Sequence, residues 1–345
     1  MELKHVNLNE NEILKLRIKD LPLHLEASDV YPWVQEVLHE LEAKSLNFRP
    51  RIYFGDEWFS PEGQNAIAVP FFLAHKKLRQ LEKKMMLECE GDTEESFKRL
   101  FRHELGHAFD HAFGVSRRKS WQKIFGSNKK PYTPESYRPR PYSKNFVRNI
   151  SETYAQAHPD EDFAETFACW LDPQSDWRNK YKSWGALKKL VFVDKLCGEF
   201  KNRVAPPAKG KMLCDARYLQ SNLERYYQRK RKAFEDDYPD FYDKDLVQIF
   251  AQIPSKSFIP TTGTALIKAS SFMRKQRRDI LKTISLWTKE RKITISQIYD
   301  KLIDRANELD LVLSKDIHQT SIELTAFLST LVSHYRFTGH FKRQA

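Results

Sequence analysis

Residues 93–114 constrain this 345-residue chain more than any other segment, because they predict one long helix with both ends marked. Asp92 can cap its start, with Glu95 three residues further on in a capping-box arrangement. Gly114 can end it in the left-handed conformation that glycine adopts at little cost. The segment is therefore expected to be a rigid element on which side chains hold fixed relative positions.

This predicted helix contains the sequence HELGH at residues 103–107. Residues four apart on a helix face the same side, so His103 and His107 can bind one metal ion. Glu104 lies beside them and can act as general base on a metal-bound water. Catalytic zinc sites use three protein ligands and one water, and two imidazoles with one carboxylate favour Zn²⁺. A third ligand must therefore come from elsewhere in the chain.

The residues after HELGH exclude one class of zinc enzyme. A metzincin would need glycine at position 110 and histidine at position 113, but the chain has Asp110 and Phe113. His111 drifts by about 80° from the direction of His103 over two turns, so we expect it to lie outside the ligand set. Asp110, on the same helix, is a candidate to orient His107 by a hydrogen bond.

Residues 158–171 predict a second helix, which supplies the best candidate for the third ligand, Glu161. Glu165 follows one turn later and can accept the spare N–H of a ligating histidine, which would fix the tautomer of that histidine. Asp160 and Asp162 remain alternatives to Glu161 in the ligand role.

The stretches HELGHAFD and EDFAETFACWL resemble gluzincin-type zinc metallopeptidases. They are especially similar to the bacterial family described as "putative zinc-binding metallopeptidases", and the resemblance extends over about residues 10–200. In the related catalytic domains of the anthrax lethal factor-like type, a tyrosine seven residues before the ligand glutamate polarises the scissile carbonyl. That position is Tyr154 here, so the resemblance implies that Tyr154 stabilises the oxyanion.

The predicted elements indicate an α+β fold. Residues 13–26, 51–59 and 66–74 have strand-like patterns, and Pro70 places the last strand at a sheet edge, where an extended peptide could pair with it. This order is expected of a zincin-like domain, in which a small twisted sheet lies over the HExxH helix.

The chain is expected to divide into three parts. We predict a zincin-like metallopeptidase domain at residues 1–204, a linker at 205–211 and a mainly α-helical accessory domain at 212–345. The helical region is basic, because residues 205–345 contain 25 Lys and Arg against 16 Asp and Glu, in a chain of net charge +12.

Residues 115–150 form a second basic region, with ten Lys and Arg against one acid, Glu135. This region links the two halves of the predicted site. It is either a solvated loop or one wall of a substrate cleft, and the second interpretation favours acidic peptides.

Taken together, these patterns predict a zinc-dependent peptidase, a hydrolase that acts on a peptide or protein substrate. The alternative is a non-catalytic zinc-binding protein whose basic helical region binds nucleic acid or a protein partner. The complete HExxH argues against a lost active site, and basic helix faces are usually just solvated, so nucleic acid is not the expected partner.

Cysteine usage and hydropathy predict a cytoplasmic protein without a membrane partner. The four cysteines, Cys89, Cys169, Cys197 and Cys214, form no CxxC pair. The first residues show no apolar signal-peptide run, and the longest apolar run, residues 67–74, is too short to span a bilayer.

Overall fold

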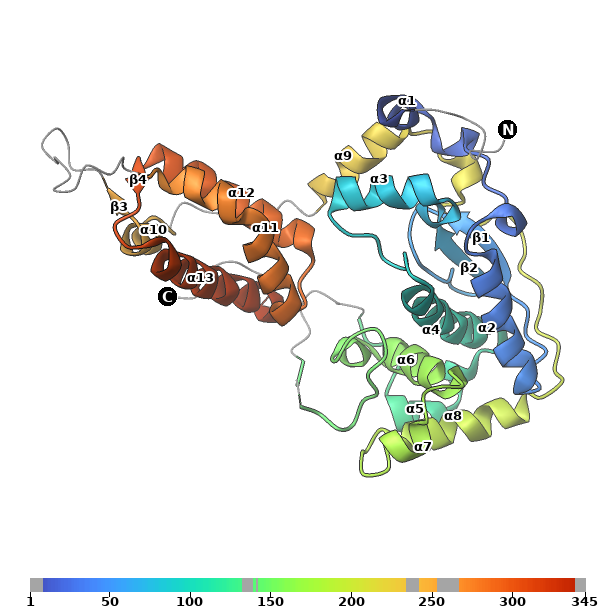
Figure 1. The fold of residues 1–345 in the computed structure, drawn as a ribbon. Helices are drawn as coiled ribbons and strands as arrows, with labels where there is room; N and C mark the ends of the chain where they lie inside the picture. The colour runs from blue at the N-terminus through green and yellow to red at the C-terminus, as the bar shows by residue number, and fades with distance from the viewer. Residues whose placement is uncertain (1–8, 132–138, 141, 234–241, 253–266, 339–345) are drawn as a thin grey trace, which may run out of the picture. The chain divides into compact units, whose positions relative to one another are not determined.

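The structure is a computed structural model that describes residues 9–131, 139–140, 142–233, 242–252 and 267–338. Part of the basic region at 115–150, including Glu135, lies outside the described residues. The chain forms two compact units: Met1–Met85 with Cys89–Tyr226, and Met86–Glu88 with Tyr227–Ala345. Helices dominate the described residues, which also contain two small two-stranded sheets, so the fold is α+β as predicted (Figure 1).

The elements before Tyr226 follow one another as helices and two short strands. They are α1 (Glu10–Lys15), η2 (Ile18–Asp20), η3 (Leu25–Ala27), α2 (Tyr31–Ala43), β1 (Arg51–Gly55), β2 (Ala66–Pro70), η4 (Phe71–Ala74), α3 (Lys76–Met86), α4 (Glu94–Phe113), η5 (Val115–Arg117), α5 (Lys119–Phe125), η6 (Tyr154–Gln156), α6 (Pro159–Leu171), α7 (Trp177–Lys180), α8 (Leu187–Glu199) and η7 (Ala216–Tyr218). Helix α9 (Leu223–Lys232) contains the boundary between the units.

The sheet of the first unit has two parallel strands, with Arg51 opposite Ala66 and Gly55 opposite Pro70. The strand predicted at residues 13–26 is wrong, because this segment forms the end of α1 and two 3-10 turns. A capping box between Asn9 and Glu12 starts α1. The amides of Ile18 and Lys19 donate to backbone carbonyls at 219–221, so these donors are satisfied without a sheet ladder.

The other two predicted strands, at residues 51–59 and 66–74, are longer than the observed ones, since β1 ends at Gly55 and β2 ends at Pro70. Residues 71–74 form the 3-10 turn η4 because β2 ends at Pro70, which cannot donate to a ladder. The far edge of β2 is partly occupied, since the Ala68 amide donates to the Phe59 carbonyl (2.8 Å) in an isolated antiparallel bridge.

Helices α4 and α6 pack against each other at the centre of the first unit (Figure 1). The rings of Phe109 on α4 and Phe167 on α6 lie 5.4 Å apart, and both side chains are fully buried. Helix α2 and strand β2 also contact α4. The HELGH segment is thus carried by a helix that packs against α6, α2 and β2.

Residues 205–226 belong to the first compact unit. The Asn65 side-chain amide donates to the Pro206 carbonyl (3.0 Å), and the Tyr53 hydroxyl donates to the Leu213 carbonyl (2.9 Å). Met212 is buried against the sheet with Tyr53. The division into a domain at 1–204, a linker at 205–211 and a domain at 212–345 stays a prediction.

The second unit is mainly helical. It contains α10 (Asp243–Ile249), α11 (Ala269–Thr288), α12 (Lys292–Glu308) and α13 (Ile317–Thr338), with two-residue strands β3 (Ala251–Gln252) and β4 (Leu311–Val312) paired antiparallel. Its core is a cluster of buried apolar side chains drawn from all four helices and β4. No helix within the described ranges of the chain combines the length and hydrophobicity needed to span a membrane.

Candidate metal centre

The N-cap of helix α4 lies one residue later than predicted. Thr93 is the N-cap, and its hydroxyl accepts from the Ser96 amide in a capping box, whereas Glu95 forms an ion pair with Arg99. The predicted Asp92–Glu95 box is therefore wrong. The predicted C-terminus is correct, since Gly114 has a φ of 62° and its N–H donates to the Asp110 carbonyl.

Helix α6 has a histidine cap. The amide of Asp160 donates to His158 Nδ1 (3.2 Å), and His158 Nε2 lies 2.9 Å from the Lys130 carbonyl. Pro159 occupies the first turn, where its missing N–H costs nothing. This cap fixes the first turn of α6, which carries Glu161.

Gly106 allows α4 and α6 to approach closely. A Cβ added to Gly106 would lie 2.8 Å from Ala164 Cα and 3.1 Å from Phe167 Cβ. A side chain at this position would therefore separate the two helices. The glycine inside HELGH brings the histidines of α4 next to the glutamates of α6.

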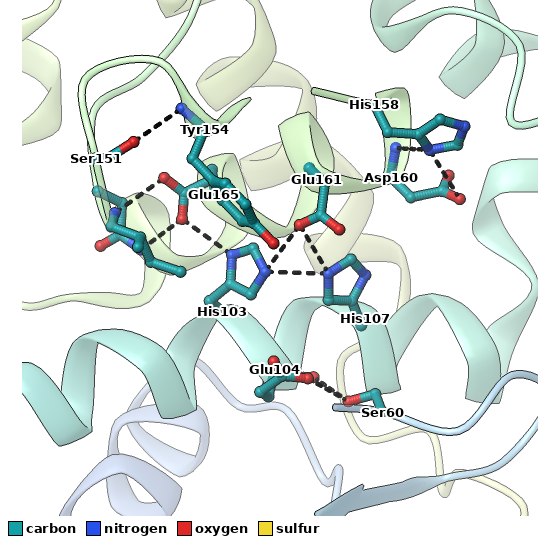
Figure 2. Close-up of polar contacts among 12 residues, drawn as sticks. Ser60, His103, Glu104, His107, Ser151, Tyr154, His158, Asp160, Glu161 and Glu165 are labelled. Atoms are coloured by element: carbon teal, nitrogen blue, oxygen red, sulfur yellow. Dashed lines mark hydrogen bonds and ion pairs between the residues drawn. The ribbon is translucent and has the colours of Figure 1, made fainter. Parts of the chain in front are cut away.

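Three candidate ligand atoms form a nearly equilateral triangle (Figure 2). The His103 and His107 Nε2 atoms are 3.1 Å apart, and Glu161 Oε2 lies 3.1 Å from the first and 3.3 Å from the second. Zinc bonds of about 2.0–2.1 Å in a tetrahedron place neighbouring ligands about 3.3–3.4 Å apart. The three atoms thus match one face of a zinc tetrahedron, which leaves the fourth position open.

Glu165 holds the ring of His103 from the other side. Its Oε1 lies 2.9 Å from His103 Nδ1 and accepts a second hydrogen bond from Asn149 Nδ2 (2.9 Å), while Oε2 accepts from the Ile150 amide (3.0 Å). Glu165 is fully buried. In the neutral ring this contact places the His103 proton on Nδ1 and leaves the Nε2 lone pair facing His107 and Glu161.

The aspartates that flank Glu161 have other partners. Asp162 is buried and its carboxylate pairs with Lys189 Nζ (2.6 Å), whereas Asp160 lies 3.4 Å from His158 Nδ1. Of these three acids in the described structure, only Glu161 joins the group of ligand atoms around the two histidines. The geometry favours Glu161 over both alternatives.

Two further residues of α4 lie near the triangle. Asp110 Oδ1 accepts from the Ser116 amide (2.6 Å), which ties it to the turn after the helix, and its predicted effect on His107 stays a prediction. The His111 ring stacks on His107 with centroids 6.4 Å apart, and burial lowers its pKa. His111 is not part of the ligand group.

The charges of the site are coupled through these contacts. Burial alone would lower the pKa of His103, but its hydrogen bonds to Glu161 and Glu165 raise it to about 10. Burial would raise the pKa of Glu161, and the two histidines hold it far below its ordinary value. A cation in this place is therefore strongly stabilised, either as a proton or as a metal ion that displaces it.

Glu104 lies beside the histidines on α4 and is buried. Burial raises its pKa, while His107 and His103 lower it. Its carboxylate Oε2 accepts from the Ser60 hydroxyl (3.1 Å), as Figure 2 shows. Across the site, the Tyr154 ring extends from η6 toward the group of ligands, with its centroid 5.6 Å from that of His103 (Figure 2).

Sequence reasoning missed three residues of this site, namely Ser60, Asn149 and Ile150. None lies in a motif, and Ile150 contributes through its backbone amide, which leaves no trace in the sequence. Of the predicted residues, His103, His107 and Glu161 form the group of possible ligands. Glu165 and the Tyr154 ring lie against His103, whereas the Glu104 carboxylate is turned toward Ser60 (Figure 2).

Comparison with known proteins agrees with the motifs. No curated protein and no solved structure matches the chain. The model of one family, described as "Putative zinc-binding metallo-peptidase", matches residues 88–191, a segment that includes α4, η6 and α6. The resemblance predicted from the two motifs is thus confirmed over residues 88–191, the segment that is similar to this family.

Proposed function

We propose that the protein is a zinc-dependent peptidase. The observation that carries this proposal is the triangle of His103 Nε2, His107 Nε2 and Glu161 Oε2, whose sides of 3.1, 3.1 and 3.3 Å fit one face of a zinc tetrahedron. These three residues would hold the metal. When bound, zinc supplies a Lewis acid and an activated water for attack on a peptide carbonyl.

The remaining residues would move protons and stabilise charge. Glu104 would accept the proton of the attacking water and pass it to the leaving amine. Its burial beside two histidines supports this role, because the elevated pKa of the carboxyl brings its proton affinity closer to that needed at neutral pH. The Tyr154 hydroxyl would donate to the developing oxyanion.

We also propose a zincin-like arrangement and a preference for acidic peptides. The contact between β2 and α4 supports the first, since it sets the small sheet against the HExxH helix. The excess of Lys and Arg over acid in residues 115–150 supports the second. Peptides of equal length carrying Glu or Lys around the cleaved bond test the preference directly, and equal kcat/KM for both would contradict it.

The proposed function itself is tested in two steps. Metal analysis of the wild type, His103→Ala and Glu161→Ala should give about one zinc per chain in the wild type and a large loss in both variants. Glu104→Gln should keep its zinc but lose hydrolysis of a peptide library. A zinc-loaded wild type that cleaves no peptide in that library would contradict the proposal.

A further inference from the structure

Ser60 contacts the proposed base from outside the matched family segment. It lies in the connection between β1 and β2, and its Oγ is 2.9 Å from the Glu104 backbone carbonyl and 3.1 Å from Glu104 Oε2 (Figure 2). The family match begins at residue 88, so this contact joins a separate part of the chain to the HExxH turn.

The backbone around Ser60 is itself fixed. The preceding residue, Phe59, accepts a hydrogen bond from the Ala68 amide of β2 (2.8 Å), and the Pro61 carbonyl accepts one from the Gln64 amide (3.1 Å). Ser60 is also partly shielded from solvent. The hydroxyl is therefore held at a defined place beside α4 by backbone that is bonded to the sheet.

The contact leaves the two carboxylate oxygens of Glu104 in different situations. The Ser60 hydroxyl has one proton and shares it between the Glu104 backbone carbonyl (2.9 Å) and Oε2 (3.1 Å), whereas no donor among the described residues bonds to Oε1. Because Glu104 is largely buried, water cannot freely replace the serine contact. One oxygen is anchored, and the other is left to take a proton.

From this geometry we propose that Ser60 is a positioning residue that sets the direction of the Glu104 carboxylate for proton transfer. The inference rests on the proposed peptidase function, in which Glu104 is the base. The reaction depends on how closely the base approaches its proton, so a carboxylate with free side-chain rotation should act less often from a productive orientation.

The kinetic test compares Ser60→Ala with Ser60→Thr in the zinc-loaded full chain. Ser60→Ala should lower kcat about tenfold, the factor expected from losing one hydrogen bond to a charged group, while KM and zinc content stay the same. Ser60→Thr keeps the hydroxyl and should retain most of kcat. Ser28→Ala is the matched control, because Ser28 Oγ also donates to a backbone carbonyl, that of Leu25, at 2.6 Å.

An unchanged kcat in Ser60→Ala, or a Ser60→Thr variant as slow as Ser60→Ala, would overturn the inference. A fall in zinc content that matches the fall in kcat would overturn it as well, because Ser60 would then act on the metal site and not on the base.

A second measurement does not depend on activity. In the metal-free protein, Ser60→Ala should lower Tm by about 3–6 °C when Glu104 is present and by clearly less in a Glu104→Ala background. In the Glu104→Ala background the Ser60 hydroxyl can still donate to the backbone carbonyl, so the difference measures what the carboxylate adds to that bond. Equal losses in both backgrounds would refute the contact, whereas an inactive wild type with unequal losses would refute only the peptidase function.

Discussion

Glu165→Gln tests whether Glu165 on α6 sets the zinc affinity of the histidines on α4. The carboxylate accepts three hydrogen bonds in a fully buried position, from His103 Nδ1, Asn149 Nδ2 and the Ile150 amide. Glutamine has the same shape but only one acceptor oxygen. If that oxygen takes the place of Oε1, it still serves His103 and Asn149, and the amide nitrogen then faces the Ile150 N–H.

The cost can be worked from these contacts. Leaving the Ile150 N–H without an acceptor costs about 1–3 kcal/mol, and the two remaining hydrogen bonds each weaken when the acceptor loses its charge. A total of about 2–4 kcal/mol in the free energy of unfolding follows, which corresponds to a fall in Tm of about 4–16 °C. Zinc affinity should fall about 10–100-fold, because His103 loses the partner that fixes its tautomer.

Calorimetry of the metal-free protein and a competition titration with a chromophoric zinc chelator measure the two effects separately. Asp194→Asn is the control, since Asp194 accepts from Trp170 Nε1 (2.8 Å) on α6 but lies outside the ligand group. It should change stability without changing zinc affinity. A Glu165→Gln variant that binds zinc as tightly as the wild type would refute the reasoning, even if its Tm falls.

Three further predictions address packing, charge and chemistry. Gly106→Ala should force α4 away from Ala164, since the new Cβ would lie 2.8 Å from its Cα; Tm and zinc affinity should fall together, and a variant equal to the wild type in both would contradict the close approach. Lys189→Met leaves Asp162 buried without its partner, which should cost about 3–5 kcal/mol. Burial already raises the pKa of Asp162 to about 7, and loss of Lys189 should raise this pKa further. Above about pH 4 the carboxyl of Asp162 is ionised in the unfolded state, whereas in the folded state it keeps its proton up to the higher pKa, so stability falls as pH rises. The stability deficit measured by denaturant titration should therefore be larger at pH 8 than at pH 5, and a pH-independent deficit would argue against a charged Asp162. Tyr154→Phe should keep zinc and KM while lowering kcat, as measured by steady-state kinetics, and an unchanged kcat would remove Tyr154 from the mechanism.

The two helices of the site could be predicted because their signals are local. Gly114 has the left-handed backbone expected of it, and Pro159 lies in the first turn of α6. The cap of α4 was misplaced by one residue, since Asp92, Thr93 and Ser96 are all capable caps and only the observed contacts decide between them.

The sheet was harder to predict. Residues 13–26 alternate apolar and polar side chains like a strand, but they form local turns, and the amides of Ile18 and Lys19 donate to carbonyls at 219–221, more than 190 positions away in sequence. An alternating pattern predicts which side chains are buried, but it does not predict which other elements they pack against.

The sequence by itself determined the pair of histidines, because residues four apart on one helix share a face whatever surrounds them. Only the tertiary structure decided which acid completes the triangle. Asp160, Glu161 and Asp162 are consecutive and each could ligate a metal, but α6 packs closely on α4 at Gly106 and Ala164 in one particular rotation. That rotation points Glu161 and Glu165 at the histidines, whereas Asp162 faces Lys189. The anchoring of Glu104 by Ser60 across 44 residues likewise depends on packing that no local pattern encodes.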